Sequence, residues 1–320
     1  MNVLELKNLK VIFPSMRGIV RAVEGVDICI KKGECLALVG ESGCGKSITS
    51  LAAMKLLPDT AVSRVDSHKI AGVDITKCSE KELQEIRGKK IAIVFQDALS
   101  ALNPVMPVGK QIEEVFLCHT DMSKEEAKEK AIEALASVGI PNPEIRSKDY
   151  PHELSGGMRQ RVLIAMAFSC NPDVIIADEP TTALDVTIQA QVLELLSKLQ
   201  KERNTALLLI THDLSVVRHM ADRSAVMYSG KIVEEAPAKE LFEHPMHPYT
   251  KGLMASVATL DRKEGPFVQI AGSLPDPADK PEGCYFHPRC KDAKKGCEQG
   301  MPRLREVSSG HKVRCYLGEV

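Results

Sequence analysis

The first part of the chain alternates apolar and polar positions in two long stretches. Residues 3–12 and 20–30 both repeat with a period of two, and turn-forming residues at 14–18 separate them. This alternation predicts two antiparallel strands, each with one buried face. A short apolar run at 35–39 then enters a glycine-rich loop, and residues 46–56 carry the pattern of a helix.

Further along the chain, short continuous apolar runs alternate with helical patterns. The runs lie at 91–95, 174–177, 206–210 and 225–228, and we expect helices over roughly 187–202 and 214–221. Strands that alternate with helices predict an α/β fold whose sheet is largely parallel, with right-handed crossovers.

Residues 97–172 interrupt this alternation and predict a helical subdomain. Asn103, Pro104 and Pro107 indicate a loop at its start. Ser123, with Glu three residues later, has the capping-box pattern and opens a helix that stops at Gly139. A second helix is expected at about 157–169.

The composition changes after about residue 256. Four prolines break the periodicity, and a cysteine-rich tail follows. A length of 320 residues favours two domains. We therefore predict one large domain at 1–255 and an extension at 256–320. Because residues 266–320 have little periodic apolar sequence, we expect this segment to need a staple in a compartment that disfavours disulfides.

Composition restricts the class of protein. The net charge of −1 and the aromatic content of 4% argue against a nucleic-acid partner. No apolar run is long enough for a membrane helix, and no secretory signal pattern is present, so we expect the chain in the cytoplasm. Its ten cysteines are then not expected to form a disulfide framework.

Residues 40–47, Gly-Glu-Ser-Gly-Cys-Gly-Lys-Ser, match a phosphate-binding loop and lie between a predicted strand and a predicted helix. In such loops the backbone N–H groups face the phosphates, the lysine reaches the β- and γ-phosphates, and the last hydroxyl holds Mg²⁺. We expect ATP contacts from Gly40, Ser42, Gly43, Cys44, Gly45, Lys46 and Ser47.

Cys44 lies inside this loop at the start of a helix, where the pKa of a thiol tends to fall. Two interpretations are open: a small residue that fills the position, or a reactive thiol. In the second case a thiol reagent would block ATP binding, and ATP would protect the thiol.

The apolar strand at 174–177 ends in two carboxylates, Asp178 and Glu179. A strand end of this kind can deliver Asp178 to Mg²⁺. Glu179, one residue further, can orient or deprotonate an attacking water. We therefore expect Glu179 to be the catalytic base.

Several motifs together resemble the ABC ATPase family over about residues 1–255. Leu154-Ser155-Gly156-Gly157-Met158 resembles the ABC signature sequence. The other matching features are a glutamine that ends a strand, Gln96; a D-loop, Ala183-Leu184-Asp185; a switch histidine, His212; and an aromatic residue for the adenine ring, Phe13. The resemblance implies an ABC-type P-loop NTPase with an antiparallel β subdomain and a helical subdomain.

The resemblance also implies a mechanism. Two ATPase subunits bind two ATP molecules head-to-tail, each ATP lying between the P-loop of one subunit and Ser155, Gly156 and Gly157 of the other. Gln96 would complete the Mg²⁺ and water shell, and His212 would contact the γ-phosphate. Asp185 would belong to the same nucleotide site.

Finer features resemble the ATPase subunits of dipeptide and oligopeptide importers. They are the stretches 95–104, 247–250, 270–275 and 283–290, together with Met158 in the signature. This resemblance implies a peripheral subunit at the cytoplasmic face of the membrane. Its partners would be a second ATPase, expected to be a paralogue, two integral permeases and, indirectly, an extracytoplasmic peptide-binding protein. A nickel importer ATPase and a redox-regulated soluble ABC ATPase remain alternatives.

Four cysteines of the tail, Cys284, Cys290, Cys297 and Cys315, have the spacing C-x5-C-x6-C-x17-C. Zinc sites favour closer cysteine pairs, and four thiolates also suit a [4Fe–4S] cluster. The importer resemblance implies the cluster, with zinc as the alternative. His287 and His311 are possible substitute ligands, although we expect both on the surface.

Overall fold

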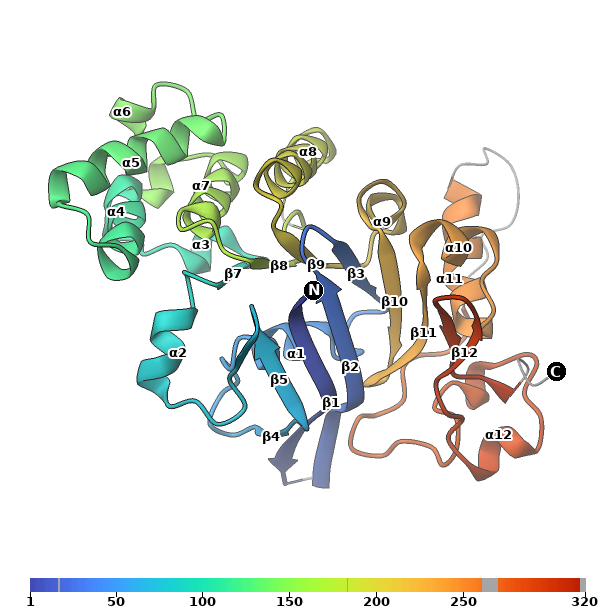
Figure 1. Ribbon diagram of the computed structural model, residues 1–320. Coiled ribbons are helices and arrows are strands. Elements are labelled where there is room, and N and C mark those ends of the chain that lie inside the picture. The colour runs from blue at the N-terminus through green and yellow to red at the C-terminus, as the bar shows by residue number, and fades with distance from the viewer. Residues whose placement is uncertain (17, 183, 261–269, 317–320) are drawn as a thin grey trace. The chain divides into compact units, whose positions relative to one another are not determined.

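The computed structural model describes residues 1–16, 18–182, 184–260 and 270–316, with the side chains of 257–260 excepted (Figure 1). These residues form two compact units, and the chain passes between them several times. The first contains Met1–Leu4, Cys29–Glu34 and Lys69–Leu209; the second contains Glu5–Ile28, Cys35–His68 and the residues from Ile210 on. Each unit therefore joins segments that are distant in sequence.

Parallel strands form the core of the first unit. Strand β7 (Ile91–Val94) pairs in parallel with β8 (Val174–Asp178), and β9 (Ala206–Thr211) is the other neighbour of β8. Every residue of β8 and β9 is buried. Burial on both faces explains why these strands are continuous apolar runs rather than alternating ones. A short antiparallel pair, β5 (Ser67–Ile70) and β6 (Val73–Asp74), precedes them.

Helices make up most of the rest of this unit. They are α2 (Glu80–Ile86), α3 (Ala98–Ala101), α4 (Val108–His119), α5 (Lys124–Ser137), α6 (Pro143–Arg146), α7 (Gly156–Phe168) and α8 (Val186–Arg203), with a 3-10 turn at Pro151–Glu153. The capping box at Ser123 is confirmed. Helix α4 was not predicted, because Pro104 and Pro107 indicated a loop. Pro107 instead occupies the N-cap position of α4, where its missing N–H leaves no helical bond unmade.

The second unit begins with the long strands that the alternation predicts. They are β1 (Asn2–Ser15) and β2 (Gly18–Lys31), which are neighbours in the sheet. Strand β4 (Val62–Arg64) pairs antiparallel with β1, Lys10 lying opposite Arg64.

The other strands of this unit are hydrogen-bonded in the order β12-β13-β11-β10-β3. They are β3 (Cys35–Val39), β10 (Arg223–Tyr228), β11 (Lys231–Pro237), β12 (Arg305–Ser308) and β13 (His311–Val313). Strands β3 and β10 are parallel, as predicted, whereas the pairs β10–β11, β11–β13 and β12–β13 are antiparallel. The helices are α1 (Lys46–Ala53), α9 (Leu214–Met220), α10 (Ala238–Glu243) and α11 (Pro248–Leu260). Strands β11, β12 and β13 had no counterpart in the predicted pattern.

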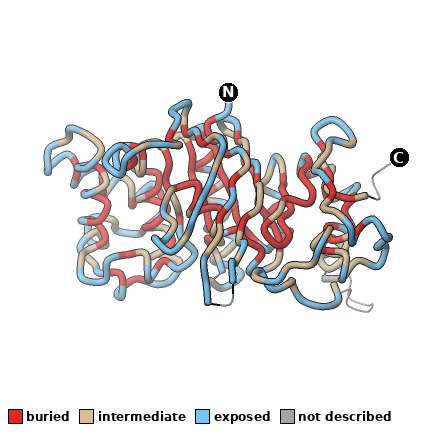
Figure 2. The backbone as a smooth tube through the Cα atoms, turned by 90° about the horizontal axis from the view of Figure 1, so that it is seen from below, coloured by how far each residue is buried: buried red, intermediate tan, exposed pale blue. Residues whose placement is uncertain are grey.

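The described part of the cysteine-rich extension has little regular structure but a defined core contact. Besides β12 and β13 it contains a 3-10 turn at His287–Arg289 and helix α12 (Gly296–Gln299). The ring of Phe286 packs against Tyr228 and Tyr249, with ring centroids 5.2 and 5.4 Å away. Figure 2 shows buried positions in this segment between exposed loops. The extension therefore has an aromatic anchor in addition to its cysteines.

His311 corrects one expectation from the sequence. It is 1% exposed, and its Nε2 lies 2.7 Å from Oε1 of the buried Glu234. The histidine was expected on the surface because it lies in a polar, turn-rich segment. Pairing of β13 with β11 brings it instead to a buried carboxylate that polar neighbours must satisfy.

Candidate functional site

The phosphate-binding loop lies between β3 and α1, and two of its glycines are required by close backbone approaches. Gly40 has φ 155°, and a Cβ there would lie 2.3 Å from the carbonyl oxygen of Met227. Gly45 has φ 112° at the N-cap of α1, and a Cβ would lie 2.6 Å from the carbonyl oxygen of Ala22. Since these carbonyls belong to β10 and β2, the loop is held closely against both strands.

Lys46 is held over this loop by the loop's own backbone. Its side chain is buried, and Nζ donates to the carbonyl oxygens of Gly40 at 2.8 Å and Glu41 at 3.1 Å. Ser42 and Ser47 are exposed, Ser47 in the first turn of α1. The residues within 40–47 that are predicted to contact phosphate and Mg²⁺ thus lie in one loop and at the start of helix α1.

Cys44 behaves as a core residue of this loop. It is 1% exposed, and burial raises the pKa of its thiol to about 11, although the charge of Lys46 acts in the opposite direction. The expectation of a lowered pKa was wrong, because desolvation of the thiolate outweighs the field of the helix start. The interpretation as a small residue that fills space fits this burial.

The predicted carboxylates stand at the end of β8 in the first unit. Asp178 is 7% exposed, and Glu179 has φ 46°, a left-handed conformation that is strained for a residue with a side chain. Such strain is typical of functional positions. The Glu179 carboxylate accepts a hydrogen bond from Thr182 Oγ1 at 2.9 Å and a longer one from Gln96 Nε2 at 3.5 Å.

The structure therefore brings the predicted residues Gln96 and Glu179 together. It also adds Thr182, which the sequence analysis missed. Only its position three residues after the glutamate, in the same loop, could have indicated it.

The signature and D-loop side chains also cap helices. Ser155 is the N-cap of α7, and its Oγ accepts a hydrogen bond from Met158 N at 3.3 Å. Asp185 is the N-cap of α8, and its carboxylate accepts from Ile188 N at 3.0 Å. Ser155 keeps its hydroxyl hydrogen for another acceptor, since it uses only a lone pair in the cap. Ala183 of the predicted D-loop lies outside the described residues.

The remaining predicted residues belong to the same unit as the phosphate loop. His212 is exposed directly after β9, and Phe13 is half-buried on β1. Phe13 is absent from the fully buried core of the described residues. A partly open ring of this kind can stack on a planar ligand.

The four tail cysteines line one small cavity of about 10 Å³, together with His247 and His287. Burial, with a smaller contribution from the neighbouring Cys297 and Cys315, raises the pKa of the Cys284 thiol to about 11. Within the described ranges, no three His, Cys, Asp or Glu side chains converge on a single metal position. The four predicted thiols thus line the same cavity but do not converge on a single metal position.

His247 in this cavity was not predicted to lie near the cysteines. It is 1% exposed, and burial lowers the pKa of its imidazole to about 3, so the ring is neutral at pH 7. Its Nδ1 accepts a hydrogen bond from Tyr249 N at 3.1 Å. The cavity therefore contains a neutral imidazole as well as four thiols.

Comparison with known protein families gives two matches. The sequence profile described as "ABC transporter" matches residues 23–182, and the profile described as "Oligopeptide/dipeptide transporter, C-terminal region" matches residues 233–297. The first match contains the phosphate loop, the signature and both strand-end carboxylates. The second contains three of the four tail cysteines.

Individual relatives resemble the chain over almost its whole length. The oligopeptide transport ATP-binding protein AppD of Bacillus subtilis is 50% identical over 317 residues, covering 99% of this chain and 97% of AppD. The dipeptide transport ATP-binding protein DppD of the same organism is 48% identical, with 98% and 94% covered. A solved dimeric structure of the ATP-binding cassette MJ0796 with ADP and Pi has a TM-score of 0.63 and 30% identity, with 73% of this chain and 98% of that chain covered.

The parallel sheet, the phosphate loop and the strand-end carboxylates define a P-loop ATPase of the ABC type. The chain belongs to the family of ATP-binding subunits of oligopeptide and dipeptide ABC transporters. Its function is the one that defines this family, the hydrolysis of ATP to energise peptide transport. In the described ranges, no helix combines the length and apolar composition that a bilayer crossing requires.

Proposed function

We propose that the chain binds Mg²⁺ and ATP at residues 40–47 and hydrolyses ATP with Glu179 as the base. Lys46 and the backbone N–H groups of the loop bind the phosphates, and Ser47 and Asp178 hold Mg²⁺. The buried Lys46 ammonium, already held at the loop by two carbonyls, supports this assignment. Phe13 stacks on the adenine ring.

The observation that carries the proposal is the pair of donors on the Glu179 carboxylate. Thr182 and Gln96 both donate to Oε2, and these two hydrogen bonds fix the orientation of the carboxylate at the end of β8. A base acts on a proton only within hydrogen-bond reach, so its orientation matters as much as its pKa. We infer that Gln96 also completes the Mg²⁺ and water shell and that His212 contacts the γ-phosphate.

We further propose that the site is shared between two ATPase subunits arranged head-to-tail. Ser155 and Gly156 are exposed at the start of α7, where the backbone N–H groups of a helix attract anions. With Gly157 and Asp185 they would serve the ATP bound by the other subunit. The solved MJ0796 structure is described as dimeric with ADP and Pi, which supports a dimer as the working form.

The partner subunits follow from the same proposal. We infer a paralogous second ATPase and two integral permeases, with this chain peripheral at the cytoplasmic membrane face and an extracytoplasmic binding protein acting indirectly. Because ATP binds the closed dimer better than the open one, ATP binding shifts the population toward the closed dimer. Hydrolysis of ATP then allows the dimer to open. The helical segment after Gln96 would pass this movement to the permeases.

Peptides are the cargo that we propose. The printed names of the relatives, oligopeptide and dipeptide transport ATP-binding proteins, support it. The deciding experiment loads membrane vesicles containing the complete transporter with ATP and measures uptake of labelled dipeptides, oligopeptides and Ni²⁺. ATP-dependent peptide uptake that Glu179→Gln abolishes is expected. Uptake of Ni²⁺ alone would replace the peptide proposal by the metal-importer alternative.

We also propose that Cys284, Cys290, Cys297 and Cys315 hold a [4Fe–4S] cluster. The residues fit the group, since four thiols line one cavity in a segment of little regular structure. A zinc ion is held by thiolates that converge on one point and a cluster by four thiolates that stand further apart, so a zinc site at the same four cysteines is the alternative. When bound, the cluster would cross-link the extension and carry no step of ATP hydrolysis.

The metal proposal is tested by anaerobic purification after iron-replete expression. About four iron atoms per chain and a brown colour are expected. One zinc per chain without iron would replace the cluster by a zinc site. No bound metal with an ordered extension would contradict both.

A further inference from the structure

The cysteine-rich extension reaches the phosphate loop through one buried arginine. The side chain of Arg289 is 7% exposed, and its Nη1 lies 3.1 and 3.2 Å from the two carboxylate oxygens of Glu41. Its other hydrogen bonds go to Tyr228 OH at 3.3 Å and to the carbonyl oxygens of Ile270 and Ala271. The guanidinium is therefore fixed in place, and one of its acceptors belongs to the loop.

Glu41 is in turn one of the two loop residues, with Gly40, whose carbonyl oxygens hold Lys46. Its N–H donates to Tyr249 OH at 3.0 Å, and its carbonyl oxygen accepts from Lys46 Nζ at 3.1 Å. With the Arg289 contact, Glu41 is fixed at its amide, its carbonyl and its carboxylate. A shift of this residue would change the acceptor geometry of the Lys46 ammonium.

The charge of Glu41 also needs compensation. A carboxylate inside an anion-binding loop repels the phosphates that Lys46 and the backbone N–H groups attract. The Glu41 side chain is only 28% exposed, so water screens this repulsion incompletely. The Arg289 guanidinium, at ion-pair distance, cancels the negative charge.

We propose that Arg289 is a positioning residue for ATP, which neutralises Glu41 and fixes the loop segment that holds Lys46. The inference rests on the proposed function of residues 40–47 as the ATP phosphate site. It makes nucleotide affinity depend on a side chain more than 240 positions away in sequence. It also places that side chain directly before Cys290, one of the four cavity thiols.

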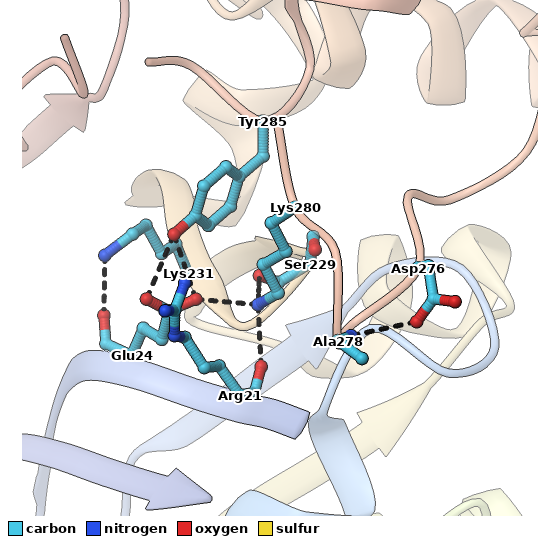
Figure 3. A network of polar contacts seen from close by, with 8 residues as sticks. All are labelled: Arg21, Glu24, Ser229, Lys231, Asp276, Ala278, Lys280 and Tyr285. Atoms are coloured by element: carbon cyan, nitrogen blue, oxygen red, sulfur yellow. Dashed lines mark hydrogen bonds and ion pairs between the residues drawn. The ribbon is translucent and has the colours of Figure 1, made fainter. Parts of the chain in front are cut away.

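A second ion pair of the extension supplies a matched control (Figure 3). Lys280 is 2% exposed at its side chain and lies 2.7 Å from Glu24 Oε1. It also donates to the carbonyl oxygens of Arg21 and Ser229, and Tyr285 OH donates to Glu24. These partners belong to β2 and to the turn after β10, outside residues 40–47. Lys280 therefore fixes the same extension as Arg289, without the contact to Glu41.

The test is the dissociation constant of ATP, measured with Mg²⁺ on the full chain at two salt concentrations. Arg289→Met is expected to raise Kd about tenfold, because it leaves the Glu41 charge facing the phosphates, and the effect should shrink at high salt. Adding Glu41→Gln in the same chain removes that charge and is expected to return Kd to within about twofold of wild type. Lys280→Met is expected to lower the thermal midpoint but to change Kd less than about twofold.

An unchanged Kd in Arg289→Met would overturn the proposal. So would a weakened Kd that Glu41→Gln does not rescue, because a purely structural arginine gives that result. If Arg289→Met does not fold, Glu41→Gln alone decides: it should bind ATP more tightly than wild type, and weaker binding would overturn the inference. Lys46→Ala tests the proposed ATP site separately from the role of Arg289. Unchanged ATP binding by Lys46→Ala would contradict the ATP site itself.

Discussion

Several polar residues of the nucleotide motifs are exposed at helix starts, whereas three basic side chains of the C-terminal extension are buried and paired. Ser42 and Ser155 are exposed at the starts of helices. By contrast, the side chains of Lys280, Arg289 and His311 are 2%, 7% and 1% exposed, each within reach of a carboxylate. Exposed polar groups can bind a ligand, while buried charged groups are tolerated only with partners. Substitutions in the motifs should therefore affect activity, and those in the extension should affect mainly stability, with Arg289 as the exception because it contacts Glu41 of the phosphate loop.

The largest effect is expected at Glu179. Glu179→Gln keeps the size and the acceptor oxygen but cannot take a proton, so hydrolysis should fall by about a thousandfold while ATP binding remains. Steady-state phosphate release and equilibrium ATP binding measure the two quantities. Hydrolysis at the wild-type rate would remove Glu179 from the mechanism.

The shared site is tested by mixing two inactive variants of this chain under conditions in which the chain pairs with itself in place of its paralogue. Lys46→Ala and Gly156→Asp should each lower hydrolysis by about a hundredfold, the first by loss of charge-assisted bonds to phosphate and the second by repulsion. A mixed dimer has one intact composite site, so mixing should recover part of the activity. Gly156 is preferred to Gly157, because a Cβ at Gly157 would lie 2.6 Å from Ile188 Cγ2. Full activity of either variant alone would contradict the arrangement.

Cys44 lies in a nucleotide motif but is buried, so we expect its thiol to react slowly. With a pKa of about 11 against 9.0 for an ordinary thiol, its thiolate fraction at pH 8 is about a hundredfold lower. Labelling by a thiol reagent should be slow at pH 8, rise as the pH approaches 11, and lag behind the exposed Cys118. Mass spectrometry of labelled peptides measures both rates. Equal labelling of the two cysteines at pH 8 would restore the reactive-thiol interpretation.

The smallest effect on nucleotide binding is expected in the extension. Cys290→Ser should lower the iron content and the thermal midpoint, because it removes a proposed ligand from the cavity. Its Kd for ATP should rise less than about fivefold, against about a hundredfold for Lys46→Ala, since Cys290 is outside the loop and acts on it indirectly, as through the adjacent Arg289. Cys118→Ser is the matched control. A loss of ATP binding as large as that of Lys46→Ala would erase the distinction between the two regions.

Most of the nucleotide motifs could be predicted because their chemistry depends on neighbouring residues. The phosphate loop, its flanking strand β3 and helix α1, and the carboxylates after β8 are each contiguous in sequence. The capping box of α5 is likewise a four-residue pattern with a local physical cause. The spacing of the tail cysteines indicated a common site, and the structure places all four around one cavity.

What the sequence by itself determined is therefore a set of short-range features: the strands and helices with a clear periodic pattern, and the residues that can bind phosphate. Tertiary structure alone decided that Thr182 and Gln96 meet at Glu179, that His311 pairs with Glu234, and that Arg289 reaches Glu41. Except for Thr182, these partners are separated by 77 to 248 positions. A local pattern fixes backbone conformation within a few residues, but contacts at such separations depend on how the packed elements bring their ends together.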